Sequence, residues 1–151
     1  MIDDLSKLLR WKKNSAIFFQ KTCDILHPEN VVRLSFDDCL TSGRTIMENV
    51  RKNRNLKESM AKYVYSFDEN KLLAEGTIRS FFSEGEIFVN FGFPDERGIY
   101  KCERDIVAKK AAELQKNICE LVIFSDALNL SGVLLDWEYD EVRKKYEIAI
   151  W

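Results

Sequence analysis

Apolar residues recur every three or four positions in the N-terminal third of the chain, which is the spacing of amphipathic helices. The pattern predicts one helix over residues 2–13 and a second over 16–26, with Ser15 as the N-cap of the second. His27 stands directly before a proline, so the second helix should end there. A third helix is predicted over 36–50, where apolar residues or glycine follow steps of four and three: Phe36, Leu40, Gly43, Met47 and Val50.

From about residue 62 the hydrophobic period changes to two, which is typical of strands that bury one face. We therefore predict an antiparallel meander over residues 62–93 that includes a strand over 72–82. Residues 94–98 should form the loop that follows it. In the last strand of the meander Phe88 should lie on the free side, and the residues expected to face the core are Ile87, Val89, Phe91 and Phe93.

The C-terminal third returns to a helical period and then to strands. Apolar residues step by four and three over 104–118, which predicts a helix. Strands are predicted over residues 120–125, 131–138 and 144–151, the first of them covered on both faces. The predicted fold is a single α+β domain over residues 1–151, with N-terminal helices packed on a mostly antiparallel sheet.

Composition and charge exclude several classes of protein. The 151 residues carry a formal net charge of −2, whereas a dedicated nucleic-acid binder normally has a basic excess. The longest apolar runs are about four residues, far too short to span a membrane. An acidic start without a long apolar stretch does not resemble a signal peptide, so we expect a cytoplasmic protein.

Four cysteines are present without any Cys-x-x-Cys pair. Zinc ribbons and thioredoxin-like motifs need closer spacing, so we interpret these cysteines as buried reduced thiols. The single histidine, His27, falls at a predicted helix end, where it is better explained as a helix-terminus or surface residue than as a catalytic base. No glycine-rich phosphate loop is present, and we expect no cofactor.

Residues 85–91 resemble the central RNA-contacting motif of RNA-recognition domains in one glycine and three apolar positions. Glu84 and Glu86 stand where that motif has a basic residue and a stacking aromatic. That family also has a helix where we expect none, between residues 68 and 85. Core packing of a strand therefore explains the stretch better.

Two charged clusters suggest alternative functions. Residues 44–62 form the one basic cluster, which a nucleic-acid-associated protein could use, although its solvation at a helix end needs no function. Asp136, Glu138 and Asp140 alternate, so their carboxylates would share one strand face and could hold Mg²⁺ or Ca²⁺ in a metal-dependent enzyme. The solvated face of an edge hairpin explains these carboxylates better, because metal sites usually draw ligands from more than one element.

A non-enzymatic protein-binding or inhibitory domain is the function that the sequence favours. The acidic hairpin lies near aromatic residues, a combination that suits charge-guided association with a basic protein. An immunity protein or antitoxin that masks the active site of a toxin such as a nuclease is one instance of this class. The predicted partner-binding residues are Asp136, Glu138, Asp140, Glu141, Phe88 and Trp151.

Overall fold

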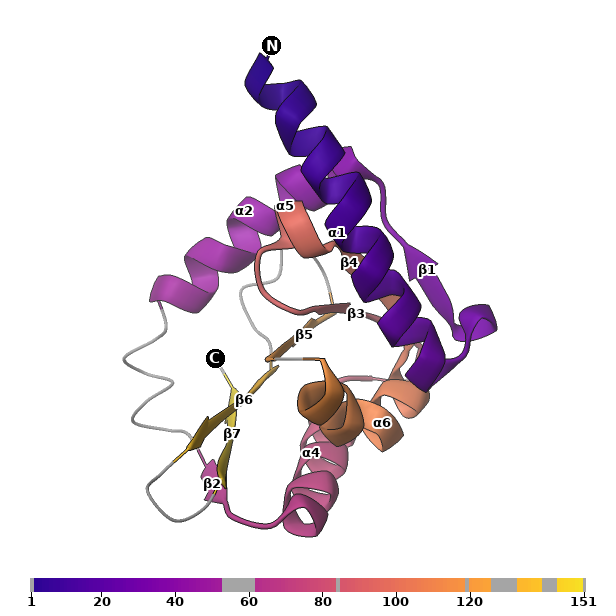
Figure 1. Cartoon of the computed structure of the whole chain (residues 1–151). Helices are drawn as coiled ribbons and strands as arrows, with labels where there is room; N and C mark the ends of the chain where they lie inside the picture. Colours follow the sequence, from indigo (N-terminus) through magenta and orange to yellow (C-terminus); the bar gives the residue numbers. More distant parts are fainter. Residues whose placement is uncertain are drawn as a thin grey trace.

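The computed structural model describes residues 2–52, 62–83, 85–118, 120–125, 133–139 and 144–150. Helices and short helical turns are interspersed with strands along the chain (Figure 1). In chain order the elements are α1 (Ile2–Leu26), η1 (Pro28–Asn30), β1 (Val31–Arg33), α2 (Phe36–Lys52), β2 (Lys62–Val64), α4 (Phe67–Phe81), β3 (Glu86–Asn90), α5 (Pro94–Arg97), β4 (Ile99–Glu103), α6 (Arg104–Asn117), β5 (Leu121–Phe124), β6 (Val133–Tyr139) and β7 (Lys144–Ile150).

The strands form one sheet in the order β1-β4-β3-β5-β6-β7-β2, and each of these pairings is antiparallel. The predicted α+β class with a mostly antiparallel sheet is confirmed. The order also places β6 and β7 inside the sheet, with β1 and β2 at its edges. The interpretation of β6 and β7 as an edge hairpin is therefore wrong, because the short strand β2 pairs with the outer side of β7.

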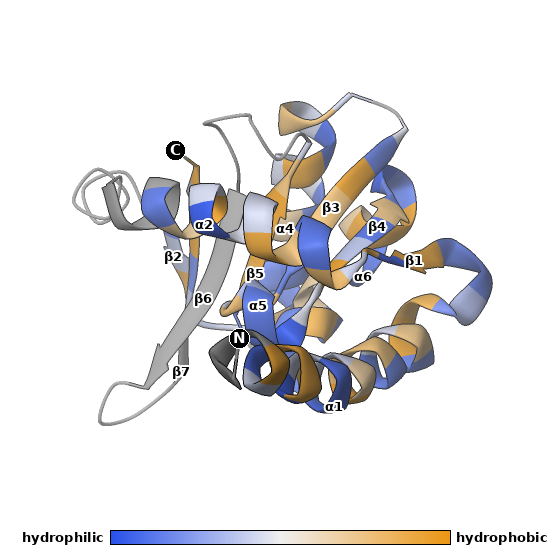
Figure 2. Cartoon of the chain, turned by 90° about the horizontal axis from the view of Figure 1, so that it is seen from above, coloured by the Kyte–Doolittle hydropathy of each residue, from blue (hydrophilic) through white to orange (hydrophobic). Residues whose placement is uncertain are grey.

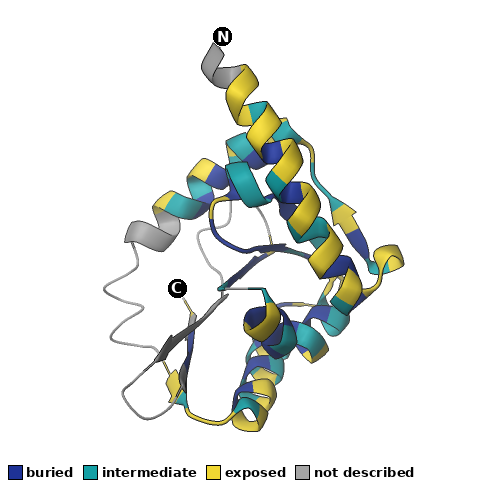
Figure 3. Ribbon diagram, in the orientation of Figure 1, coloured by how far each residue is buried: buried dark blue, intermediate teal, exposed yellow. Residues whose placement is uncertain are grey.

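Helices cover both faces of the sheet, so alternate residues of the strands enter two separate cores (Figure 1). On one face, α4, α6 and the end of α1 pack against residues such as Val89 and Ile123. On the other, α2 and Trp11 of α1 pack against Val122 and Phe124. All of β5 is buried, as predicted, and the central strands are the most enclosed part of the described chain (Figure 3).

The two predicted N-terminal helices are one continuous helix, α1. Lysine is a good helix former, and Lys12 and Lys13 lie on the exposed side, so the polar break in the pattern does not interrupt the backbone. Ser15 does not cap a helix; it is fully buried and its Oγ accepts a hydrogen bond from Arg33 Nη2. Apolar and polar residues are interspersed along α1 (Figure 2).

The predicted strand over 72–82 is wrong, because residues Phe67–Phe81 form helix α4. Ser66 caps this helix, since its Oγ accepts a hydrogen bond from Glu69 N at 3.1 Å. The buried residues of α4 are Asn70, Ala74 and Ile78, and Asn70 Nδ2 donates a hydrogen bond to Gln115 Oε1 of α6 at 2.8 Å. A helix therefore does lie between residues 68 and 85, so the argument from element order against an RNA-recognition fold fails.

The remaining predicted elements agree with the structure within a few residues. The helix over 104–118 is α6, and the helix over 36–50 is α2, which starts where Asp38 N donates to Ser35 Oγ at 3.2 Å. The predicted loop over 94–98 contains the short helix α5, which Pro94 begins. Among the described residues, no helix combines the length and the apolar composition that crossing a membrane requires.

Candidate functional site

The loop between β3 and β4, residues 91–98, is held in place by a buried polar residue. Asn90 is fully buried at the end of β3, and its Oδ1 accepts a hydrogen bond from Gly92 N at 2.9 Å. Its Nδ2 donates to Gly98 O at 2.8 Å, so one side chain joins both ends of the loop. The Tyr100 hydroxyl adds a third constraint by donating to Arg97 O at 2.6 Å. The backbone of this loop is therefore fixed from several sides.

Phe93 lies in this fixed loop with a left-handed backbone conformation, at φ 45° and ψ 64°. That region costs a residue with a Cβ atom about 1–2 kcal/mol. Phe93 is also 56% exposed, so its own burial does not explain the conformation. Its carbonyl oxygen accepts hydrogen bonds from Glu96 N and Arg97 N, and Pro94 after it is buried. The surroundings thus force a large aromatic side chain outward on strained backbone, a feature that occurs often at functional sites.

Arg97 connects Phe93 to α1. Its guanidinium carbon lies 5.1 Å from the ring centre of Phe93 and 5.1 Å from that of Phe18, so the guanidinium is held between two aromatic rings. Arg97 Nη1 also donates to Phe91 O at 2.7 Å, which fixes the side chain. We call Phe18, Phe93 and Arg97 the Phe93 surface. Aromatic residues and arginine dominate the binding energy of protein interfaces, and this surface presents both in a rigid arrangement.

The sequence pattern assigned Phe93 to the core and left Phe88 free, and the structure reverses both positions. Strand β3 ends at Asn90, and Gly92 has a positive φ of 79°, so the two-residue alternation stops before Phe93. The dipeptide Gly92-Phe93 directly before a proline was the signal for this break, because glycine and proline interrupt regular structure.

Phe88 is half-buried and packs against the core on the α2 side of the sheet. Its ring stacks on that of Phe124 of β5, with ring centres 5.5 Å apart and planes 17° apart. A ring in this contact has one face covered, so Phe88 offers a partner or an RNA base less surface than predicted. Its packing agrees with the interpretation of residues 85–91 as a core strand.

The acidic residues of β6 and β7 share one face of the sheet. The register pairs Asp136 with Glu147 and Glu138 with Lys145, so two acidic residues are cross-strand neighbours next to a pair of residues of opposite charge. Glu147 is only 3% exposed. The face at that position is therefore covered. The predicted site residues Asp140, Glu141 and Trp151 lie outside the described residues.

The basic cluster over residues 44–62 is divided between two elements. Arg44 is exposed on α2, and Lys62 is exposed on the edge strand β2. Residues 53–61, which hold the middle of the cluster, lie outside the described residues. A surface that joins these cations therefore stays a prediction.

The described cysteines are poor candidates for a catalytic nucleophile. Cys23, Cys39 and Cys102 are buried free thiols, as predicted, and burial raises the pKa of each, that of Cys102 to about 12. A thiol with a raised pKa is a poor nucleophile at neutral pH. Among the described residues no three side chains of His, Cys, Asp or Glu are placed to hold a metal ion.

No model of a known protein family matches the chain, and comparisons with curated proteins and with solved structures give no match. Its function is therefore inferred from its own geometry.

Proposed function

We propose that this chain is a non-enzymatic protein-binding domain that holds its partner through the Phe93 surface. The exposed, strained and rigidly held Phe93 carries the proposal. An anchor that is already ordered in the free protein loses little conformational entropy on binding, which favours affinity. The Arg97 guanidinium beside it extends the surface with a cation that the Phe18 and Phe93 rings hold in place.

A narrower form of the proposal is an inhibitor, for example an immunity protein or antitoxin that masks the active site of a basic toxin such as a nuclease. Its support is the acidic composition of the β6 and β7 region, where Asp136 and Glu138 occupy one face. Complementary charge would speed the encounter with such a partner, while Phe93 would supply the contact that holds the complex.

The test is affinity purification of the tagged full chain from its native lysate, with nuclease treatment and at two salt concentrations. Phe93→Ala removes the anchor, and Leu72→Ala is the matched control, because Leu72 is even more exposed, at 73%, but lies on α4. The proposal expects one stoichiometric protein partner that Phe93→Ala loses and Leu72→Ala retains. Equal recovery by all three proteins would contradict the role of Phe93.

Charge reversal tests the inhibitor form separately. Changing Glu138 and Asp140 to Lys should slow association with a basic partner and leave the melting temperature of the domain nearly unchanged. We exclude Asp136 from this variant because it stands opposite the buried Glu147, where a new charge would alter folding. An unchanged association rate would refute the acidic contribution.

The two alternative functions predict other outcomes in simple titrations. A nucleic-acid-associated protein would bind RNA or DNA with an affinity that falls steeply with salt, and a flat titration at low salt would remove this alternative. A metal-dependent enzyme that uses Asp136, Glu138 and Asp140 would be stabilised against heat by Mg²⁺, Mn²⁺ or Ca²⁺, and Asp136→Asn would abolish the effect.

A further inference from the structure

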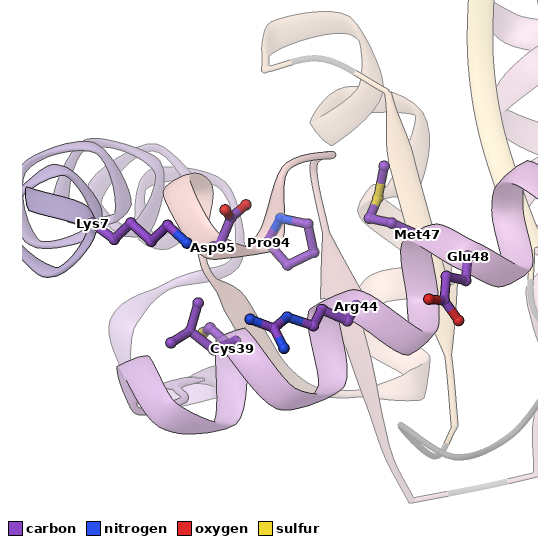
Figure 4. Close-up of a pocket in the computed structure, with 9 residues that line it drawn as sticks. Lys7, Cys39, Arg44, Met47, Glu48, Pro94 and Asp95 are labelled. Atoms are coloured by element: carbon purple, nitrogen blue, oxygen red, sulfur yellow. The ribbon is translucent and has the colours of Figure 1, made fainter. Parts of the chain in front are cut away.

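A cleft of about 290 Å³ lies between the start of α1, the middle of α2 and α5 (Figure 4). Its apolar lining consists of Leu40, Met47 and Pro94. Helices α2 and α5 touch beside it, since a Cβ atom on Gly43 would lie only 2.8 Å from Pro94 Cβ. Small-molecule sites usually measure about 300–1,000 Å³, so this cleft has room for a small ligand only.

Two cations from different helices line the cleft, Lys7 of α1 and Arg44 of α2. Neither forms an ion pair with a described carboxylate. The Arg44 side chain runs away from Glu48 and along α2 towards Cys39, while the Lys7 side chain points from α1 towards Asp95 (Figure 4). The carboxylates of Asp95 and Glu48 also line the cleft and offset part of its positive charge, and the Arg44 guanidinium, which points away from Glu48, supplies most of the attraction for an anion (Figure 4).

We propose that this cleft binds a small organic carboxylate with an apolar body. The Arg44 guanidinium presents paired N–H donors that match the two oxygens of a carboxylate. The apolar part of the ligand would lie against Met47 and Pro94, and the Lys7 ammonium adds a second positive charge at the rim. The inference does not depend on the proposed function, because no residue of the Phe93 surface lines the cleft.

The test uses three probes that share one ring and differ in charge: benzoate, benzyl alcohol and benzylamine. Amide chemical shifts of the full chain are followed during each titration. Benzoate should shift the amides of residues 40–48 in a saturable way, whereas the neutral and cationic probes should not. Arg44→Gln should weaken benzoate binding roughly tenfold, which is the scale of one charge-assisted hydrogen-bonded pair. Lys109→Gln is the control, because Lys109 is exposed on α6 and does not line the cleft.

A cavity-filling variant separates the cleft from general surface charge. Leu40→Trp keeps both cations but occupies the apolar space, so it should abolish the benzoate shifts while the far-ultraviolet spectrum stays helical. Absence of saturable shifts with benzoate would overturn the proposal. Equal shifts from benzylamine, equal weakening by Lys109→Gln, or full binding by Leu40→Trp would each overturn it as well.

Discussion

Phe93 offers a test in which two small residues should reverse their usual order of stability. Phe93→Ala and Phe93→Gly both delete the ring and its contact with Arg97, so that loss cancels when the two variants are compared. Only alanine keeps the Cβ atom that makes the left-handed conformation at φ 45° unfavourable.

The expected difference follows from two opposing contributions. The left-handed conformation costs a residue with a Cβ atom about 1–2 kcal/mol. Glycine loses about 0.5–1 kcal/mol more than alanine in conformational entropy when the chain folds. The free energy of unfolding of Phe93→Gly should therefore exceed that of Phe93→Ala by about 0.5–1 kcal/mol. For a chain of 151 residues this corresponds to a melting temperature about 1–4 °C higher.

The assay is urea unfolding of both variants, followed by fluorescence or circular dichroism. Leu72→Gly and Leu72→Ala form the control pair, because Leu72 lies within α4 and alanine should be the more stable there by about 1 kcal/mol. If Phe93→Ala were as stable as Phe93→Gly, the backbone at position 93 would not be strained, and the physical basis of the proposed site would be lost.

Three further predictions concern the rest of the fold. Gly43→Ala should lower the free energy of unfolding by about 1–3 kcal/mol, because the new Cβ would overlap Pro94. Gly76→Ala should raise the free energy of unfolding by about 1 kcal/mol, because its new Cβ would meet no atom within 4 Å. Urea titrations measure both. His27→Gly should raise the melting temperature and His27→Ala should not, because His27 has φ 72° at the end of α1; a lower value for the glycine variant would refute this. Stability should fall between pH 9 and about 12, because Cys102 stays protonated in the folded state, with a pKa of about 12, while the unfolded thiol ionises near 9.0. The fall should be at most about 1.4 kcal/mol per pH unit for this thiol, and Cys102→Ala should flatten it, whereas an equal slope in the variant would contradict the assignment.

The sequence predicted best those elements whose buried residues are apolar and evenly spaced. Helix α6 places Val107, Ala111 and Leu114 on one buried face, and all of β5 is buried, so the hydrophobic period alone identified both. The hydrophobic period did not identify helix α4, because the polar residue Asn70 occupies its buried face through a hydrogen bond to Gln115. That partner is 45 residues away in the chain, so no local pattern can reveal it.

The candidate site was missed for a related reason. Period-two alternation places Phe93 in the core only if the strand continues, and the strand ends at Asn90. What ends it is the buried Asn90 side chain, which binds Gly92 N and Gly98 O and so turns the backbone back on itself. The exposed position of Phe93 depends on this polar contact across the loop, whereas the sequence pattern reports only on local apolar spacing.

Strain alone does not identify a functional residue in this chain, because two described residues other than glycine have a positive φ. At His27 the strain follows from the end of α1 directly before a proline, and the exposed imidazole makes no hydrogen bond that caps the following turn. At Phe93 the same kind of strain coincides with a loop fixed by Asn90 and with a guanidinium held between two rings. A glycine would relieve the backbone strain at both positions. Only at Phe93 would it also remove a surface that is already ordered for binding. The combination of strain, exposure and rigid neighbours therefore separates a candidate binding residue from a strained helix end.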